Sequence, residues 1–233
     1  MILTVKDINT FYGTSHILQN VSLKVAEREV VALLGRNGVG KTTTLRSIMG
    51  LTPPASGSIE LAGQEVCGKP AYVISRLGLA YMPDDLRVFP DLTCEENLQI
   101  SARLAKRDGY WNQGRVEELF PVLGERRRQK GLNMSGGEKK MLSLGRALMA
   151  NPVMILLDEP SEGLAPMIVA ALSQAIGTIR EHGITILMAD QNLKFCRKVC
   201  DRGYIIEKGC IVHEGQMEDI WADEEVVHKY LAL

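Results

Sequence analysis

The residue types best suited to chemistry stand in a glycine-rich run, Gly35-Arg36-Asn37-Gly38-Val39-Gly40-Lys41-Thr42. Its spacing, Gly-x4-Gly-Lys-Ser/Thr, is typical of a loop whose backbone amides cradle phosphate groups. In such a loop the lysine reaches the β- and γ-phosphates of a nucleotide and the threonine binds magnesium. The simpler alternative is a glycine-rich turn that caps a helix, but the run joins an apolar strand to a helix. The predicted phosphate-contacting residues are Gly35, Asn37, Gly38, Gly40, Lys41, Thr42 and Thr43.

Two adjacent carboxylates, Asp158 and Glu159, follow the apolar run Val153-Met154-Ile155-Leu156-Leu157. We expect Asp158 to hold magnesium together with Thr42, and Glu159 to polarise an attacking water. The two acids could instead mark the solvated start of a loop. The phosphate loop elsewhere in the chain favours the catalytic interpretation.

A second anion site is predicted at Ser135-Gly136-Gly137-Glu138, which follows Met134. A Ser-Gly-Gly run that opens a helix offers free amides and a hydroxyl, and the helix dipole adds to the attraction. Ser135 and Glu138 also fit a capping box, and both interpretations can hold together. One chain needs no second binding site for the same γ-phosphate, unless the second site binds a nucleotide held by another copy.

Strands alternate with helices in the segments that must position these residues. Apolar strands are expected at the end of residues 1–34 and in 78–82, 153–157 and 185–188, and hairpins at 58–63 and 204–215. Helices are expected at 41–49, from a capping box at Thr93 and Glu96 to about Arg107, and at 115–123, 136–149 and 167–182. This alternation predicts a parallel sheet with active residues beyond the carboxyl ends of its strands.

The composition is that of an ordinary globular protein, with 233 residues, 45% hydrophobic residues, 24% charged residues and a formal charge of -1. That charge argues against nucleic acid as a main partner. The apolar runs are far shorter than the roughly 20 residues that span a bilayer. The start of the chain shows no secretory signal, so we expect a cytoplasmic protein.

Five cysteines form no Cys-x-x-Cys pair, which argues against a disulfide framework or a zinc site. Cys196 and Cys200 would share a helix face, so a metal pair is conceivable, but buried reduced thiols are the prediction.

With these motifs in view, the chain resembles the ATP-binding subunits of ABC transporters over essentially its whole length. Ser135-Gly136-Gly137-Glu138 resembles the signature with which that family clamps the γ-phosphate of ATP on a facing subunit. The resemblance implies that Tyr12 stacks on adenine, although an aromatic residue there could also belong to the core. It also implies ATP and Mg²⁺ as cofactors.

The implied fold is α/β: a P-loop NTPase core with a parallel sheet, an N-terminal antiparallel β subdomain and an inserted helical subdomain. Residues 1–233 would form one ATP-binding domain. Residues 1–85 and 151–233 would form the nucleotide-binding core, and residues 86–150 the helical subdomain that carries the signature.

Within the family, the chain most resembles the smaller ATPase of branched-chain amino acid uptake systems and the related urea and amide importers. The matching stretches are 81–85, 87–93, 95–98, 158–166 and 190–192. The resemblance implies ATP-driven dimer closure that powers import of a polar nutrient. A soluble, non-transporting ABC ATPase and a small-molecule phosphotransferase remain as alternatives.

The partners implied are membrane permease subunits, which would dock on the helices of 93–123, and a second ATP-binding subunit, identical or homologous. A periplasmic or extracellular substrate-binding protein would act indirectly. The implied location is the cytoplasmic face of the cell membrane, peripheral and held through the permease.

Three positions depart from the commonest family pattern. Asp84 stands where a Gln or Glu is usual; it could bind magnesium loosely or be a plain turn residue. Ala165 replaces a usual Asp. Gln191 replaces a His at the γ-phosphate, so it can donate a hydrogen bond but cannot change charge. Its neighbour Asp190 could be a strand-end residue facing solvent.

The basic run 126–130 precedes the signature. It could be a solvated face or a contact to the other subunit's nucleotide.

Overall fold

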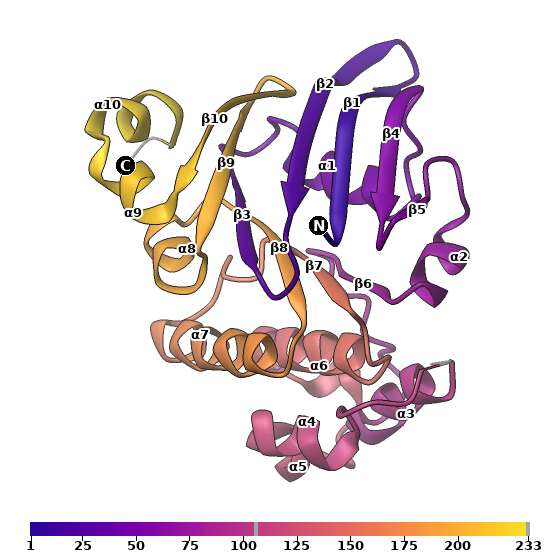
Figure 1. Ribbon diagram of the computed structural model, residues 1–233. Helices are drawn as coiled ribbons and strands as arrows, with labels where there is room; N and C mark the ends of the chain where they lie inside the picture. The colour runs from indigo at the N-terminus through magenta and orange to yellow at the C-terminus, as the bar shows by residue number, and fades with distance from the viewer. Residues whose placement is uncertain (105–106, 232–233) are drawn as a thin grey trace.

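A four-stranded antiparallel sheet and a six-stranded, mainly parallel sheet make up the β structure of the computed structural model, which describes residues 1–104 and 107–231. The smaller sheet has the strand order β2-β1-β4-β5 (Figure 1). Its strands are β1 (Leu3–Tyr12), β2 (Ser15–Val25), β4 (Ser56–Leu61) and β5 (Gln64–Glu65). Apolar residues such as Val5, paired with Leu23 and Ile59, face one side of this sheet, which is why its strands alternate in sequence.

The larger sheet has the order β10-β9-β3-β8-β7-β6. Its strands are β3 (Val30–Leu34), β6 (Leu79–Met82), β7 (Met154–Asp158), β8 (Thr185–Asp190), β9 (Arg202–Glu207) and β10 (Cys210–Gln216). All neighbouring strands run parallel except β10, which pairs antiparallel with β9. Strands β3, β7 and β8 are buried at every residue, because both faces of the sheet are covered.

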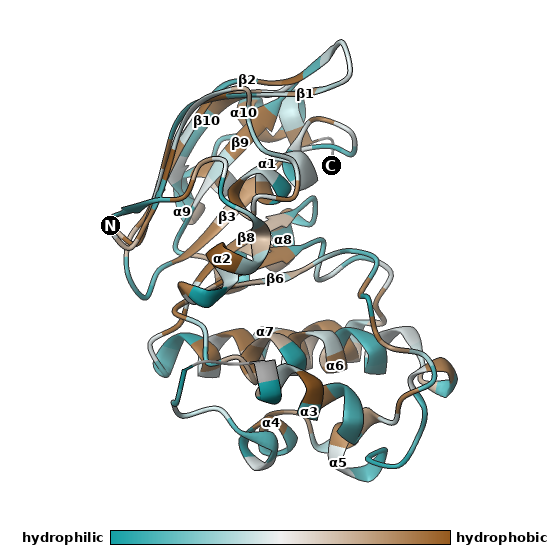
Figure 2. Cartoon of the chain, turned by 90° about the vertical axis from the view of Figure 1, so that its right-hand side faces the viewer, coloured by the Kyte–Doolittle hydropathy of each residue, from teal (hydrophilic) through white to brown (hydrophobic). Residues whose placement is uncertain are grey.

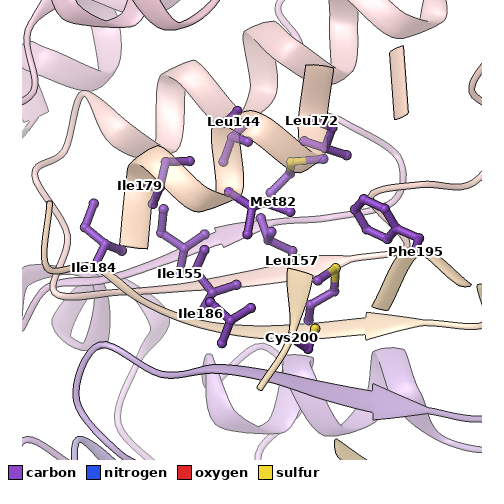
Figure 3. Close-up of a cluster of buried hydrophobic side chains, with 14 of the residues drawn as sticks. Met82, Leu144, Ile155, Leu157, Leu172, Ile179, Ile184, Ile186, Phe195 and Cys200 are labelled. Carbon is purple, nitrogen blue, oxygen red and sulfur yellow. The ribbon is translucent and has the colours of Figure 1, made fainter. Parts of the chain in front are cut away.

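Two hydrophobic cores lie on opposite faces of this larger sheet. One lies between the two sheets and includes Leu45 and Ile48 of helix α1 (Lys41–Ile48). The other packs the sheet against helices α6 (Gly136–Leu148) and α7 (Pro166–Glu181). Figure 3 shows this second core, where Leu144, Leu172 and Ile179 meet strand residues such as Ile155 and Ile186.

Most of the helical region lies beyond α6 and α7, away from the sheets (Figure 2). It contains α3 (Cys94–Leu104), α4 (Gln113–Leu119) and α5 (Pro121–Glu125). The helix predicted at 115–123 is therefore wrong as a single element. Phe120 leaves the helical conformation, with φ -129° and ψ 80°. It precedes Pro121, and the proline ring sterically disfavours helical angles at the residue before it.

Other sequence predictions of local structure have mixed outcomes. The capping box at Thr93 is confirmed, since its amide donates to Glu96 Oε2 at 2.8 Å. The predicted helix from Thr93 is confirmed as far as Leu104; residues 105–106 lie outside the described residues, and Arg107 itself is not helical. Several short helices were not predicted: α2 (Ala71–Arg76), α8 (Leu193–Val199), α9 (Met217–Ala222), α10 (Glu224–Val226), the 3₁₀ turn Gly131–Asn133 and the π-helical turn Val227–Leu231.

The predicted α/β fold, with its parallel core sheet, antiparallel N-terminal sheet and inserted helices, is confirmed. The division into residues 1–85 with 151–233 and residues 86–150 stays a prediction. Within the described part of the chain, no helix is long and apolar enough to cross a membrane. Cys94, Cys196 and Cys200 are buried, whereas Cys67 and Cys210 are partly exposed, so the prediction of buried thiols holds for three of the five free cysteines.

Candidate nucleotide-binding site

A pocket of about 270 Å³ opens where strands β3 and β7 end and helix α1 begins. It brings together the predicted loop and acidic residues, which lie far apart in the sequence. The lining residues are Asn37, Gly38, Gly40, Lys41, Thr42, Thr43, Asp84, Glu159 and Glu162. Parallel strands place their carboxyl ends at one edge of a sheet, and this edge is where the pocket lies.

Gly40 makes the start of α1 available to an anion. It is the N-cap residue, with φ 118°, and it has no side chain that could accept from the amides of the first turn. An added Cβ would lie 2.9 Å from Leu18 Cδ2, so the loop also needs glycine for packing. The amides of Lys41, Thr42 and Thr43 are thus free to bind phosphate oxygens.

Lys41 is almost fully buried, and its ammonium is bound by the protein itself. Nζ donates to the carbonyl oxygens of Gly35 at 2.9 Å and Arg36 at 3.1 Å. It also forms an ion pair with Glu159 Oε1 at 2.9 Å. A phosphate ligand would therefore replace oxygen ligands that the ammonium already has.

Glu159 occupies a strained turn directly after β7. Its φ is 48°, in the left-handed region, and its amide donates to the carbonyl of Ala189 on β8 at 2.8 Å. The carboxylate oxygen Oε2 is buried and has no hydrogen-bond partner among the described residues. An unpaired acceptor at a phosphate pocket can receive a proton from a water molecule.

Asp158 is fully buried, and two hydroxyl groups bind its carboxylate. Thr42 Oγ1 donates to Oδ1 at 3.0 Å, and Tyr81 Oη donates to Oδ2 at 2.8 Å. Burial raises the pKa of Asp158 to about 6, while these hydrogen bonds act in the opposite direction. Hydroxyl and carboxylate oxygens are the ligands that Mg²⁺ prefers, so this pair fits the ion.

Tyr81 is a site residue that the sequence analysis did not assign to the site. It lies on β6, beside β7 in the sheet, and burial raises the pKa of its hydroxyl well above the ordinary value. The signal in the sequence was a tyrosine in an otherwise apolar strand, whose hydroxyl needs a partner when buried.

Asp84, also in the pocket lining, is exposed, and its Oδ1 accepts a hydrogen bond from the amide of Asp85 at 2.8 Å. The residue thus both stabilises the turn after Pro83 and faces the pocket.

The residues Ser135 to Glu138 do not line this pocket. They form the predicted capping box, in which the Ser135 amide donates to Glu138 Oε2 at 2.7 Å and the Glu138 amide to Ser135 Oγ at 3.3 Å. Ser135 and Gly136 are exposed, and Arg126 of the basic run pairs with Glu138 at 3.3 Å. The chain's own phosphate pocket and its own Ser-Gly-Gly run are separate surfaces.

The remaining candidates lie at the margins of the site. The Tyr12 side chain is exposed, which contradicts the alternative that it belongs to the core, and its hydroxyl lies 3.3 Å from Thr52 Oγ1. Gln191 is also exposed and does not line the pocket. Asp190 is fully buried and accepts from the amides of Ser161 at 3.1 Å and Asn192 at 2.8 Å, so the prediction that it could face solvent is wrong.

Known proteins resemble both the sequence and the fold. The family model described as ABC transporter matches residues 18–162. The chain is 41% identical over 231 residues to the high-affinity branched-chain amino acid transport ATP-binding protein BraG of Pseudomonas aeruginosa, covering 99% of both chains. It is 34% identical to the lipopolysaccharide export system ATP-binding protein LptB of Escherichia coli, covering 98% of this chain and 96% of that one.

Solved structures agree with these sequence matches. A nucleotide-free ATP-binding cassette from an ABC transporter matches with a TM-score of 0.84 and 25% identity, over 97% of both chains. The ADP conformation of an ATP-binding cassette matches with a TM-score of 0.82 and 26% identity, again over 97% of both chains. The sequence motifs, the sheet topology and these matches agree: the chain belongs to the ABC transporter family and is an ATP-hydrolysing cassette of that family.

Proposed function

We propose that the chain is the ATPase subunit of an importer for a polar nutrient, with branched-chain amino acids as the substrate class. The observation that carries this proposal is the end-to-end similarity to BraG, whose name describes branched-chain amino acid transport. The loops 81–85, 158–166 and 190–192 resemble the same branch of the family.

In the proposed reaction, the amides at the start of α1 and the Lys41 ammonium bind the phosphates of ATP. Lys41 then leaves Glu159, whose carboxylate is free to polarise the attacking water. Asp158 and Thr42 would hold Mg²⁺, which would neutralise charge on the β- and γ-phosphates. Tyr81 orients the Asp158 carboxylate through its hydrogen bond.

The site is proposed to be completed by a second ATP-binding subunit, identical or homologous. Ser135 and Gly136 are exposed and lie outside the chain's own pocket, so the Ser135 hydroxyl and the Gly136 amide suit a nucleotide on a facing chain. Tyr12, also exposed, is proposed to stack on adenine. Gln191 is proposed to donate to the γ-phosphate after the pocket closes, because it is not in the lining of the open pocket.

Permease subunits are proposed to hold the chain at the cytoplasmic face of the cell membrane, and a substrate-binding protein to act through them. A groove of about 360 Å³ lies beside α3 and between the core and α6. Four arginines and no acidic residue stand among its described lining residues, so a permease segment with carboxylates would complement it. These are Arg76, Arg87, Arg107 and Arg146.

The test is reconstitution of the chain in vesicles with candidate permease subunits and a substrate-binding protein. Leucine, isoleucine or valine on the binding protein should stimulate ATP hydrolysis and accumulate inside the vesicles. Stimulation by urea or an amide instead would move the substrate class to the related importers. The similarity to LptB favours lipopolysaccharide export as a second candidate, and outward movement of lipopolysaccharide would support it against import.

A further inference from the structure

Lys140 is a buried lysine that none of the proposed chemistry uses. It lies in α6, about one helical turn after the exposed residues Ser135 and Gly136. Only 8% of it is exposed. Its Nζ donates to the carbonyl oxygens of Glu159 at 2.6 Å and Glu162 at 2.7 Å. A buried ammonium with backbone partners fixes those two carbonyls in place.

The loop that Lys140 holds is the one that carries the proposed base. Glu159 and Glu162 form a turn, since the Glu162 amide donates to the Glu159 carbonyl at 3.2 Å. With φ of 48°, Glu159 needs support from its surroundings to keep this conformation. The same residue is held through its carboxylate by Lys41. When Lys41 turns to a phosphate, the contact from Lys140 to the Glu159 carbonyl remains.

Helix α6 also lies close to helix α7, which follows this loop. An added Cβ at Gly137 would lie 3.3 Å from Ile168, in the first turn of α7, which begins directly after the loop. The first turns of α6 therefore hold the loop through Lys140 and lie close to the first turn of α7 through Gly137. Since a helix is rigid over one turn, a shift at Ser135 moves Lys140 with it.

We propose that Lys140 is a positioning residue that transmits nucleotide engagement at Ser135-Gly136-Gly137 to the Glu159 carboxylate of the same chain. This inference rests on the proposed function, in which that run binds the nucleotide of a facing subunit. ATP on one subunit then helps to align the base on the other, and the two sites hydrolyse cooperatively. Burial lowers the pKa of Lys140, and the negative charges of Asp190, Glu162, Glu159 and Asp84 act in the opposite direction.

The test compares variants in the assembled transporter. Lys140→Met keeps the length of the side chain but removes its donors, and it should lower kcat by about tenfold while ATP affinity changes less than about twofold. The Hill coefficient for ATP should fall from about 2 towards 1. Lys140→Arg retains donors and should restore at least half of the lost rate. Lys139→Met, at the adjacent position, is the matched control and should behave as wild type.

A double-mutant cycle separates transmission from general loss of structure. Ser135→Ala and Lys140→Met in one chain should be non-additive, so that the double variant is no slower than the slower single variant. The proposal would be overturned if the losses of kcat in the two single variants multiplied in the double variant. It would also be overturned if kcat and ATP affinity fell equally, or if Lys140→Arg were as slow as Lys140→Met. Should Lys140→Met not fold, Lys140→Gln replaces it in the same cycle with the same criteria.

Glu159→Gln in the same preparation identifies which idea has failed. If it leaves turnover intact, the proposed site is wrong. If it abolishes turnover while the Lys140 variants hydrolyse ATP cooperatively at the wild-type rate, only the transmission by Lys140 is wrong.

Discussion

Replacement of Asp158 by asparagine should stabilise the protein free of nucleotide and metal while it abolishes hydrolysis. The carboxylate is fully buried, and burial raises its pKa to about 6, whereas the ordinary value is 3.8. A pKa shift of about 2 units corresponds to about 3 kcal/mol, at 1.36 kcal/mol per unit. The folded protein therefore carries this cost whenever the carboxyl group must be ionised.

Asparagine removes the charge but keeps most of the hydrogen bonding. Its amide oxygen accepts from one hydroxyl, and its amide nitrogen donates to the other, because Thr42 Oγ1 and Tyr81 Oη can each donate or accept. If the hydrogen bonds to asparagine have imperfect geometry and cost about 1 kcal/mol, the free energy of unfolding still rises by about 2 kcal/mol near pH 7.5. For a protein of this size the midpoint of thermal unfolding should rise by about 4–8 °C.

The pH dependence gives the sharper measurement. Because the folded-state pKa is raised, the wild-type protein has the stability linked to this group below pH 3.8 and loses it as the pH rises through about 6. The advantage of Asp158→Asn should thus be largest above pH 6 and fade towards pH 4. Urea unfolding of both proteins across this range, with nucleotide and metal absent, measures it. A variant that is less stable at pH 7.5, or a difference that does not change with pH, would refute the reasoning.

Three further predictions concern the base, a glycine and the position after β8. Glu159→Gln should slow ATP hydrolysis at least about a hundredfold and let an ATP-bound dimer accumulate. A variant that hydrolyses ATP at the wild-type rate and remains a monomer by light scattering would contradict the shared site. Gly209→Ala should lower the free energy of unfolding, measured with denaturant, by about 2–3 kcal/mol more than Gly63→Ala does. The two glycines have similar φ values, +79° and +75°, but only at Gly209 would an added Cβ overlap a carbonyl oxygen, that of Ile17. Equal losses of stability for the two variants would contradict the role of this clash. Gln191→His should add a step near pH 6.5 to the ATPase profile; an unchanged rate and profile would make a role for Gln191 untenable.

The elements that carry the site were predictable because their signals are local. The strand, glycine-rich loop and helix around Lys41 each show in consecutive residues, and the apolar run before Asp158 marks a buried parallel strand. The break at Phe120 was missed because helical spacing continues across it, although Pro121 was a visible warning. Short helices such as α2 depend on tertiary packing and have too few residues for a periodic pattern.

Contacts across the fold had no such signal. The hydrogen bond from Tyr81 to Asp158 depends on β6 lying beside β7, and those strands are separated by the helical insert. Asp190 was open to assignment as a solvent-facing residue because a polar residue at a strand end usually is one. The Asn192 amide is a local partner two residues away, but the Ser161 amide, 29 residues away in the sequence, is brought within reach only by the fold.

The pairing of Lys41 with Glu159 explains why an ATPase of this kind need not carry a free base when it has no substrate. Each side chain is buried, and each neutralises the other at 2.9 Å, so neither charge is left without a partner. A γ-phosphate would attract the ammonium with more charge than one carboxylate offers. Its arrival would leave Glu159 buried and without its counterion, next to the pocket where the attacking water must stand. The Glu159 carboxylate would then be available to that water only when the nucleotide is in place.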